Sequence, residues 1–263
     1  MQYFFLLLSL ISVVFSQPYN DDMLYKIENI EETHQSFSFA VYGDNRGRDD
    51  ILATIIKTVD SDRDILFSIS NGDVVTTSFK YQFQNYLSLL QQSKKPILTV
   101  LGNHGIGLLE NDINFKTIFG HSYFSFVLKN SYFIILDDAD DETMASKQFL
   151  WLQKELRKAQ TYDNRFIIMH IPLYDPRAGA YAQGHSLEDM KQVKQLNDLF
   201  DRYKVTMLFT SHIHSYYRGV WHKTPYIISG GAGAPLIKGG FFHYIKVTVT
   251  GTEVEYKIIK IKT

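Results

Sequence analysis

Five short hydrophobic runs stand out along the chain, each rich in β-branched and aromatic residues. They cover residues 37–42, 65–69, 97–101, 166–169 and 205–209. Runs of this length and composition, bounded by turn-forming residues, are typical of buried β-strands. We therefore predict five buried strands, each followed by a short polar cluster.

The segments between and after these runs show the patterns of helices and of hairpins. Hydrophobic residues recur with helical spacing at residues 50–59, 79–90, 111–119, 149–156 and 187–203, the last after a Gly-His-Ser start signal. Two pairs of short runs predict antiparallel hairpins, at residues 123–136 and 244–261. Strand–helix units followed by a meander predict an α/β fold in which two stacked sheets are flanked by helices.

The polar clusters that follow the predicted strands share residue types that bind metals. They are Gly43-Asp44-Asn45-Arg46, Gly72-Asp73, Gly102-Asn103-His104, His170, and Ser211-His212-Ile213-His214. Open α/β sheets bind ligands outside the carboxyl ends of their strands, so we expect the clusters to meet at one site. Carboxylate, amide and imidazole ligands suit iron, manganese or zinc, and the chain has no cysteine for a thiolate site.

The spacing of the last cluster indicates two metals rather than one. His212 and His214 are two residues apart, so in extended backbone both side chains project to the same side. Each can then bind one of two metals lying about 3.5–4 Å apart. Asp73, at the end of a central strand, is the natural carboxylate to bridge them. Alone, an Asp or His at a strand end is usually a turn or core residue, but the ordered set favours ligation.

The order of these motifs resembles the calcineurin-like metallophosphoesterase family. Gly-Asp-x-Arg, Gly-Asp, Gly-Asn-His, a single His before Ile-Pro, and His-x-His follow one another from about residue 36 to the C-terminus. Residues 148–152 resemble the helix after the family's fourth strand, and residues 230–235 resemble its glycine turn after His-x-His. The resemblance implies one catalytic domain over residues 36–263, folded as a four-layer α/β/β/α sandwich of two mixed sheets.

Carried over by position, the resemblance implies two divalent or trivalent metal ions, with manganese, iron and zinc as candidates. The first ion would be held by Asp44, Asp73 and His214, and the second by Asp73, Asn103, His170 and His212. A hydroxide bridging the ions would attack phosphorus, while His104 would protonate the leaving oxygen or hydrogen-bond the phosphate. The expected activity is hydrolysis of a phosphomonoester or a phosphodiester.

Two positions depart from the family pattern, and one loop residue adds a candidate. Arg46 stands where the family usually has a metal-binding histidine, and a guanidinium cannot ligate a metal but can fork onto a phosphate. Gly105 stands where the family often has Asp or Glu, so His104 must be oriented by another group. His185, in the loop after His170, is either a substrate contact or a helix-start residue. The alternative to an enzyme is a non-catalytic metal- or phosphate-binding protein on the same scaffold.

The charge composition indicates which classes of binding partner and substrate to expect. The formal net charge is −1 and no basic run stands out, so nucleic acid is not favoured as a partner. The same lack of a basic groove favours a small phosphomonoester over a polymeric substrate. Nothing in the pattern indicates the oligomeric state.

The first residues predict export. Residues 3–15 are almost unbroken apolar, which is shorter than the roughly 20 residues of a membrane span, and small residues precede Gln17. We predict a signal peptide at residues 1–16, no stable membrane anchor, and a chain exported to an extracellular, periplasmic or secretory-pathway compartment. Residues 17–35 are polar and acidic, and we expect them to form an extended lead-in.

Overall fold

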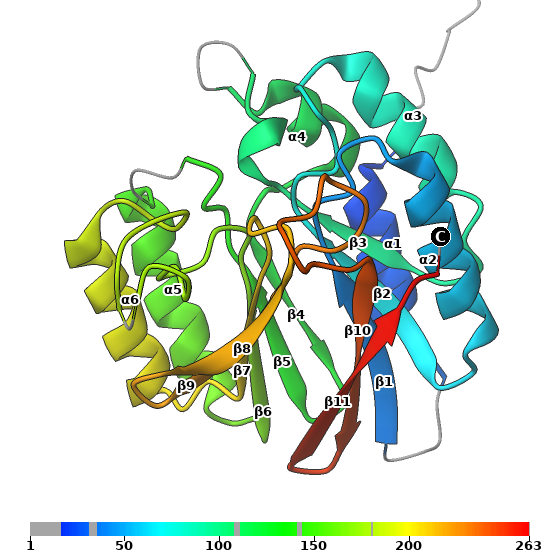
Figure 1. Cartoon of the computed structure of the whole chain (residues 1–263). Coiled ribbons are helices and arrows are strands. Elements are labelled where there is room, and N and C mark those ends of the chain that lie inside the picture. Colours follow the sequence, from blue (N-terminus) through cyan, green and yellow to red (C-terminus); the bar gives the residue numbers. More distant parts are fainter. Residues whose placement is uncertain (1–16, 32–35, 108–110, 141–143, 180, 263) are drawn as a thin grey trace, which may run out of the picture.

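In the described part of the chain, two β-sheets pack face to face with helices on their outer sides (Figure 1). The computed structural model describes residues 17–31, 36–107, 111–140, 144–179 and 181–262. Both sheets contain parallel and antiparallel pairs, which confirms the predicted four-layer α/β/β/α sandwich of two mixed sheets. The signal peptide predicted at residues 1–16 lies outside the described residues.

The first sheet has the strand order β11-β10-β1-β2-β3. Its strands are β1 (Ser36–Tyr42), β2 (Ile65–Asn71), β3 (Ile97–Val100), β10 (His243–Thr250) and β11 (Glu253–Lys260). Strands β1, β2 and β3 run parallel, whereas β10 pairs antiparallel with both β1 and β11. The carboxyl ends of the three parallel strands therefore lie at one edge of the sheet.

The second sheet has the strand order β4-β5-β6-β7-β9-β8. Its strands are β4 (Phe124–Leu128), β5 (Ser131–Ile135), β6 (Asn164–Ile168), β7 (Met207–Thr210), β8 (Tyr216–Trp221) and β9 (Thr224–Ser229). Strands β5, β6, β7 and β9 run parallel, and the two outer strands are antiparallel to their neighbours. The hairpin of β8 and β9 was not predicted from the sequence.

Helices flank the two sheets. They are α1 (Tyr19–Glu28), α2 (Asp49–Ser61), α3 (Lys80–Leu90), α4 (Ile113–Phe119), α5 (Ser146–Ala159) and α6 (Met190–Arg202). Helices α2 and α3 bury Ile55 and Phe83 against the first sheet, and α5 and α6 bury Leu156 and Phe200 against the second. Helix α6 begins later than predicted because the Asp189 side chain, rather than the Gly-His-Ser segment, accepts bonds from the first backbone N–H groups.

Aromatic side chains fill the space between the two sheets. Phe39 of β1 stacks on Phe67 of β2, with ring centroids 5.4 Å apart. Its ring edge also meets Phe133 and Phe166 of the second sheet, at centroid distances of 5.2 and 5.3 Å. Edge-to-face pairs of this kind add to the free energy gained by burying the rings. These contacts fix the two sheets relative to each other. They therefore also fix the relative positions of the carboxyl ends of the strands.

The extended lead-in expected for residues 17–35 is wrong where the structure describes it. Residues 19–28 form helix α1, and its buried residues Met23 and Ile27 join the apolar core between the sheets. The segment is polar along most of its length, so only its contacts with strands far along the chain reveal the buried face. Within the described residues, no helix is both long enough and apolar enough to span a membrane.

Candidate metal centre

The predicted ligands lie where strands of both sheets end. Asp44 follows β1 and Asp73 follows β2, whereas His170 follows β6 and His212 follows β7. Parallel strands present their carboxyl ends at one edge, and the two sheets face each other, so these side chains converge. Asn103 joins them from the short 3-10 helix η1 (Asn103–Gly105), which follows β3.

The backbone at these positions is unusual. Asp44, Asp73 and His212 have φ angles of 65°, 50° and 63°, in the left-handed region that non-glycine residues rarely adopt. Strained backbone of this kind clusters at functional sites. Gly72, with φ of 86°, lies against His170, and a Cβ at this position would fall 2.3 Å from the imidazole Nδ1. The glycine therefore permits the close approach of β2 to His170.

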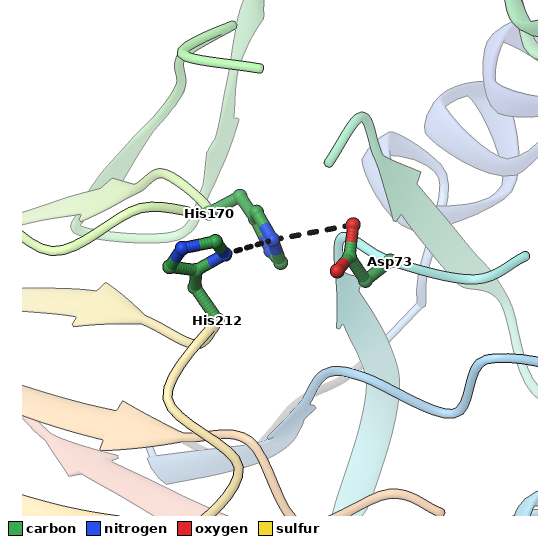
Figure 2. Close-up of side chains that lie close together, drawn as sticks. All are labelled: Asp73, His170 and His212. Carbon is green, nitrogen blue, oxygen red and sulfur yellow. Dashed lines mark hydrogen bonds and ion pairs between the residues drawn. The ribbon is translucent and has the colours of Figure 1, made fainter. Parts of the chain in front are cut away.

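One group of ligand atoms surrounds His170. Its Nε2 lies 3.3 Å from Asp73 Oδ1 and 3.2 Å from His212 Nδ1, and the three side chains point toward one another (Figure 2). Asn103 Oδ1 lies 3.1 Å from the same nitrogen. One ligand atom from each of Asp73, His170 and His212 lies within 4.8 Å of the other two. This geometry suits a single cation between them.

A second group shares one residue with the first. Ligand atoms of Asp44, Asp73 and His214 also lie within 4.8 Å of one another, and His214 Nε2 is 3.5 Å from Asp44 Oδ1. Asp73 therefore belongs to both groups. The structure thus brings all six predicted ligands into one site, arranged as two overlapping sets.

Two of the histidines are held in the tautomer that a metal ligand needs. His170 Nδ1 lies 3.0 Å from the Asn71 carbonyl oxygen, and His214 Nδ1 lies 2.9 Å from the Pro235 carbonyl oxygen. A carbonyl can only accept, so in each ring Nδ1–H donates, and Nε2 is left to bind a metal or, without one, a proton. Bonds of this kind fix the ring orientation of metal-binding histidines. In both cases Nε2 is the nitrogen that faces the carboxylates.

Burial shifts the pKa values of these groups strongly. Burial raises the pKa of Asp44 to about 7, against the opposing effect of His170. Burial alone would lower the pKa of His170, but the Asp73 carboxylate raises it to about 10. Burial lowers the pKa of His212 to about 2, so this ring is neutral. The buried carboxylates thus attract positive charge to the position between them.

The donor set fits a metal ion. Asp44 Oδ2 accepts a bond of 2.9 Å from the His212 backbone N–H. Its other oxygen, Oδ1, is buried and has no hydrogen-bond partner among the described residues. A buried carboxylate oxygen without a partner is costly unless a cation lies against it. Oxygen and imidazole donors are also the types that iron, manganese and zinc share.

His104 lies at the edge of the same site. Its backbone N–H donates to Asp73 Oδ1 at 2.9 Å, and its Nε2 lies 3.8 Å from Asp73 Oδ2. Its Nδ1 lies 2.8 Å from the Thr76 carbonyl oxygen, so Nδ1–H donates there. Nε2 is therefore the atom available for proton transfer to a group bound beside Asp73.

Arg46 also lies beside His104. Its Nη2 is 3.3 Å from His104 Nδ1, a contact and not a hydrogen bond, because Nδ1–H donates to the nearer Thr76 carbonyl and a guanidinium can only donate. The Arg46 backbone N–H donates to the Asp73 carbonyl at 3.0 Å. Its positive charge reaches the first group of ligands, where it adds to the effect of burial in lowering the pKa of His214. A guanidinium here adds positive charge at the mouth of the centre without supplying a ligand atom.

His185 reaches the centre through His212. The two rings stack with centroids 3.8 Å apart and an interplanar angle of 16°. The His185 backbone N–H donates to Asp175 Oδ2 at 2.9 Å, and the same carboxylate accepts two bonds from the Arg177 guanidinium. The loop is thus tied together by Asp175. His185 lies before helix α6, and its exposed ring flanks a predicted ligand.

Asp138 supports the site behind its ligands. From the sequence it is either a solvated surface residue, the default, or a support for the site. It is buried and accepts bonds from the backbone N–H groups of His170 and Ile171, at 2.8 and 2.6 Å. Burial raises its pKa to about 7. Its role depends on the pairing of β5 with β6, which no local pattern encodes.

Comparison with known sequences identifies the family. A profile of the calcineurin-like phosphoesterases matches residues 37–216, which include every predicted ligand. The chain belongs to this family. The matched segment contains both groups of ligand atoms.

Curated relatives are distant and longer. Purple acid phosphatase 23 of Arabidopsis thaliana is 26% identical over 141 residues, which cover 48% of this chain and 30% of that protein. The aligned part thus spans less than a third of the relative's length.

Solved structures share the phosphoesterase fold at low sequence identity. The purple acid phosphatase PPD1 from yellow lupin (Lupinus luteus) has a TM-score of 0.65 at 18% identity, covering 85% of this chain and 51% of that one. GAP50 of Plasmodium, described as the anchor in the inner membrane complex, also has a TM-score of 0.65, at 14% identity, covering 86% and 84%. These likenesses establish the fold.

Of the two positions that depart from the family pattern, Arg46 and Gly105, the structure explains the second. Gly105 removes the acidic side chain that often follows Asn-His, and the Thr76 carbonyl takes its place as the acceptor for His104 Nδ1–H. A Cβ at position 105 would lie 2.5 Å from Leu101 Cδ1, so the backbone here is packed too closely for a larger residue unless Leu101 moves.

Proposed function

We propose that this chain hydrolyses phosphate esters at a pair of metal ions. The observation that carries the proposal is the sharing of Asp73 by two groups of ligand atoms, each within 4.8 Å. Two cations about 3.5–4 Å apart need a bridging ligand of this kind. Membership of a phosphoesterase family supplies the chemistry on which such a pair would act.

The roles follow from the positions of the side chains. Six residues would hold the two ions, Asp44, Asp73 and His214 for the first and Asp73, Asn103, His170 and His212 for the second. When bound, the ions supply a nucleophile derived from water and neutralise charge on the phosphoryl oxygens. Manganese, iron and zinc all suit these donors.

His104 would deliver the proton to the leaving oxygen. Its Nε2 faces Asp73, while Nδ1–H stays bonded to the Thr76 carbonyl. In the imidazolium, which carries a proton on each nitrogen, the Nε2 proton can pass to the departing alkoxide while Nδ1–H keeps its bond, and this leaves the neutral Nδ1–H ring. Such general acids contribute about 10²–10⁴-fold. Arg46 would fork onto the phosphate, and His185 would contact the substrate from the exposed side of His212.

A small monoester is the substrate that we favour. A cavity of about 520 Å³ lies beside His104, and Thr77, Phe79 and Asn114 contribute to its walls. A space of this size suits a small leaving group rather than a polymer. The name of the Arabidopsis relative, a purple acid phosphatase, agrees with this class. We also propose that residues 1–16 direct export, which N-terminal sequencing of the secreted chain would test.

A non-catalytic role is the second candidate. Arg46 replaces a histidine of the family's first motif, and GAP50, which shares the fold, is described as an anchor. On this account the site would bind one metal or a phosphorylated ligand without turnover.

Turnover separates the two candidates. The full chain, stripped of metal and reloaded with manganese, iron or zinc, should hydrolyse p-nitrophenyl phosphate faster than bis-p-nitrophenyl phosphate. Asp73→Asn and His212→Ala should each lower kcat by about 100-fold or more, since even changes around metal ligands cost about 10–100-fold. Asp198→Asn, at an exposed carboxylate on α6, is the matched control. A folded protein that is inactive with every metal would favour the binding protein.

A further inference from the structure

The group that orients His104 belongs to an exposed turn between β2 and α3. Thr76 and Thr77 are exposed, whereas Val74 and Val75 just before them are buried. Because the Thr76 carbonyl can only accept, it keeps a proton on Nδ1 of His104. The exposed end of the turn is held by a contact of its own.

Gln82 makes that connection. Its Oε1 accepts hydrogen bonds from the backbone N–H groups of both Thr76 and Thr77, at 3.1 and 2.9 Å. Its Nε2 donates to Thr77 Oγ1 at 3.0 Å. Gln82 lies in the first turn of α3, next to Phe83, which is fully buried in the core. A single side chain thus ties the turn to a helix that is anchored in the core.

The turn also contacts Arg46. Thr76 Oγ1 donates to the Arg46 carbonyl oxygen at 3.0 Å. The same short segment therefore bonds to the imidazole of His104 and to the backbone of Arg46, the two residues that the proposed function places around the phosphate. The Gln82 side chain itself bonds to the turn.

We propose that Gln82 is a positioning residue for His104, acting through the Thr76 carbonyl. With Gln82 in place, the carbonyl accepts from Nδ1–H and Nε2 faces the reacting ester. Without it, the peptide of Thr76 is free to rotate, and the ring loses its preferred tautomer and orientation. This inference rests on the proposed function, since it concerns the proton that His104 would donate.

Esters with different leaving groups distinguish a positioning role of Gln82 from a purely structural one. An alkyl phosphate such as phosphoserine needs a proton on its leaving oxygen, whereas 2,4-dinitrophenolate departs without one. Gln82→Ala should lower kcat for phosphoserine by about 10-fold, part of the 10²–10⁴-fold that a general acid supplies. Turnover of 2,4-dinitrophenyl phosphate should change by less than about threefold.

Three variants complete the experiment. Gln82→Glu keeps an acceptor for both backbone N–H groups and should restore turnover of phosphoserine to within about threefold of the wild type. Gln84→Ala removes an exposed glutamine from the same helix and serves as the matched control. In a His104→Ala background, Gln82→Ala should cost nothing more, because the group that it positions is gone.

A readout that is independent of activity tests the same contact. Nitrogen chemical shifts of the His104 ring should report the Nδ1–H tautomer in the wild type and a mixture in Gln82→Ala. Equal losses on both esters, or an unchanged His104 tautomer in Gln82→Ala, would overturn the inference. If the wild type hydrolyses neither ester while the tautomer shifts as expected, the proposed function fails and the positioning contact stands.

Discussion

Backbone carbonyls orient three histidines of this site. His104, His170 and His214 each donate from Nδ1 to a main-chain oxygen, at 2.8, 3.0 and 2.9 Å. Such partners keep the lone pair, or the transferable proton, on Nε2. Because the acceptors belong to the backbone, the orientation of the rings depends on the course of the main chain rather than on acidic side chains.

Arg46 stands where the first motif of the family usually has a metal-binding histidine. Replacing it with histidine should add an imidazole ligand to the group of Asp44, Asp73 and His214, and so lower the Kd of the first metal by at least about tenfold. Calorimetric titration of the metal-stripped protein measures this change. Arg46→Gln, which removes the charge without adding a ligand, is the control. Equal affinities for the two variants would mean that position 46 does not reach the metal.

His243, which is not among the predicted ligands, makes stability depend on pH. Its side chain is fully buried in β10, and burial lowers its pKa to about 4, below the ordinary value near 6.5. Between pH 4 and about 6.5, the imidazole therefore binds a proton in the unfolded chain but not in the folded chain. Stability should fall as the pH decreases from about 6.5 to about 4, by roughly 3 kcal/mol from this residue.

The measurement for His243 is a comparison of two unfolding curves. Urea denaturation of the wild type and His243→Gln, each followed from pH 7 to pH 4, gives the free energy of unfolding. The wild type should lose more stability than the variant over this interval. Parallel losses in the two proteins would show that His243 is not held neutral in the folded state.

At the scale of elements, helix α1 protects the open edge of the first sheet. β3 is the edge strand, and the Asn20 side chain pairs with the Thr99 backbone, donating to its carbonyl at 2.8 Å and accepting from its N–H at 2.9 Å. Both residues are buried. Asn20 thus satisfies backbone groups that an edge strand leaves unpaired.

Removing this pairing should destabilise the protein. Asn20→Ala leaves a buried N–H and a buried C=O without partners, which should lower the free energy of unfolding by about 2–3 kcal/mol. Asn29→Ala, which loses only an exposed bond to the Tyr25 carbonyl on the same helix, should cost under about 1 kcal/mol. Urea unfolding of the two variants measures the difference. Equal losses would contradict a special role for the pairing.

The elements that the sequence predicts correctly are those with a strong local signal. The five buried strands are apolar runs bounded by turns, and β1 is buried along nearly all its length. Strand β8 was missed because its residues are mostly half-buried or exposed, and Arg218 and Gly219 interrupt the pattern. Helix α1 was missed because its buried face is formed by contacts with β3, β4 and α4, which lie far along the chain.

The predicted ligands also have a local signal in the sequence, whereas the contacts that support them have none. Each ligand follows a strand that the pattern marks, so the common edge of the sheets brings the ligands together. Asp138 and Gln82 act through hydrogen bonds to backbone groups of other loops. Such contacts depend on how loops fold against each other, and a single sequence carries no local sign of them.

At the scale of the whole molecule, the site exists only because both sheets contribute to it. Asp44, Asp73 and Asn103 come from the first sheet, whereas His170, His212 and His214 come from the second. The aromatic core between the sheets therefore sets the distance between the two halves of the centre. Binding of metal across this interface should in turn stabilise the folded chain.

The most direct test is to titrate the metal-stripped chain with manganese, iron or zinc while following both bound metal and turnover of p-nitrophenyl phosphate. The account predicts that turnover rises to its maximum at two ions per chain with at least one of these metals. It also predicts that Asp73→Asn, which removes the shared carboxylate, binds fewer ions and stays inactive. Maximal turnover at one ion, or two bound ions without turnover for every metal, would contradict the proposed centre.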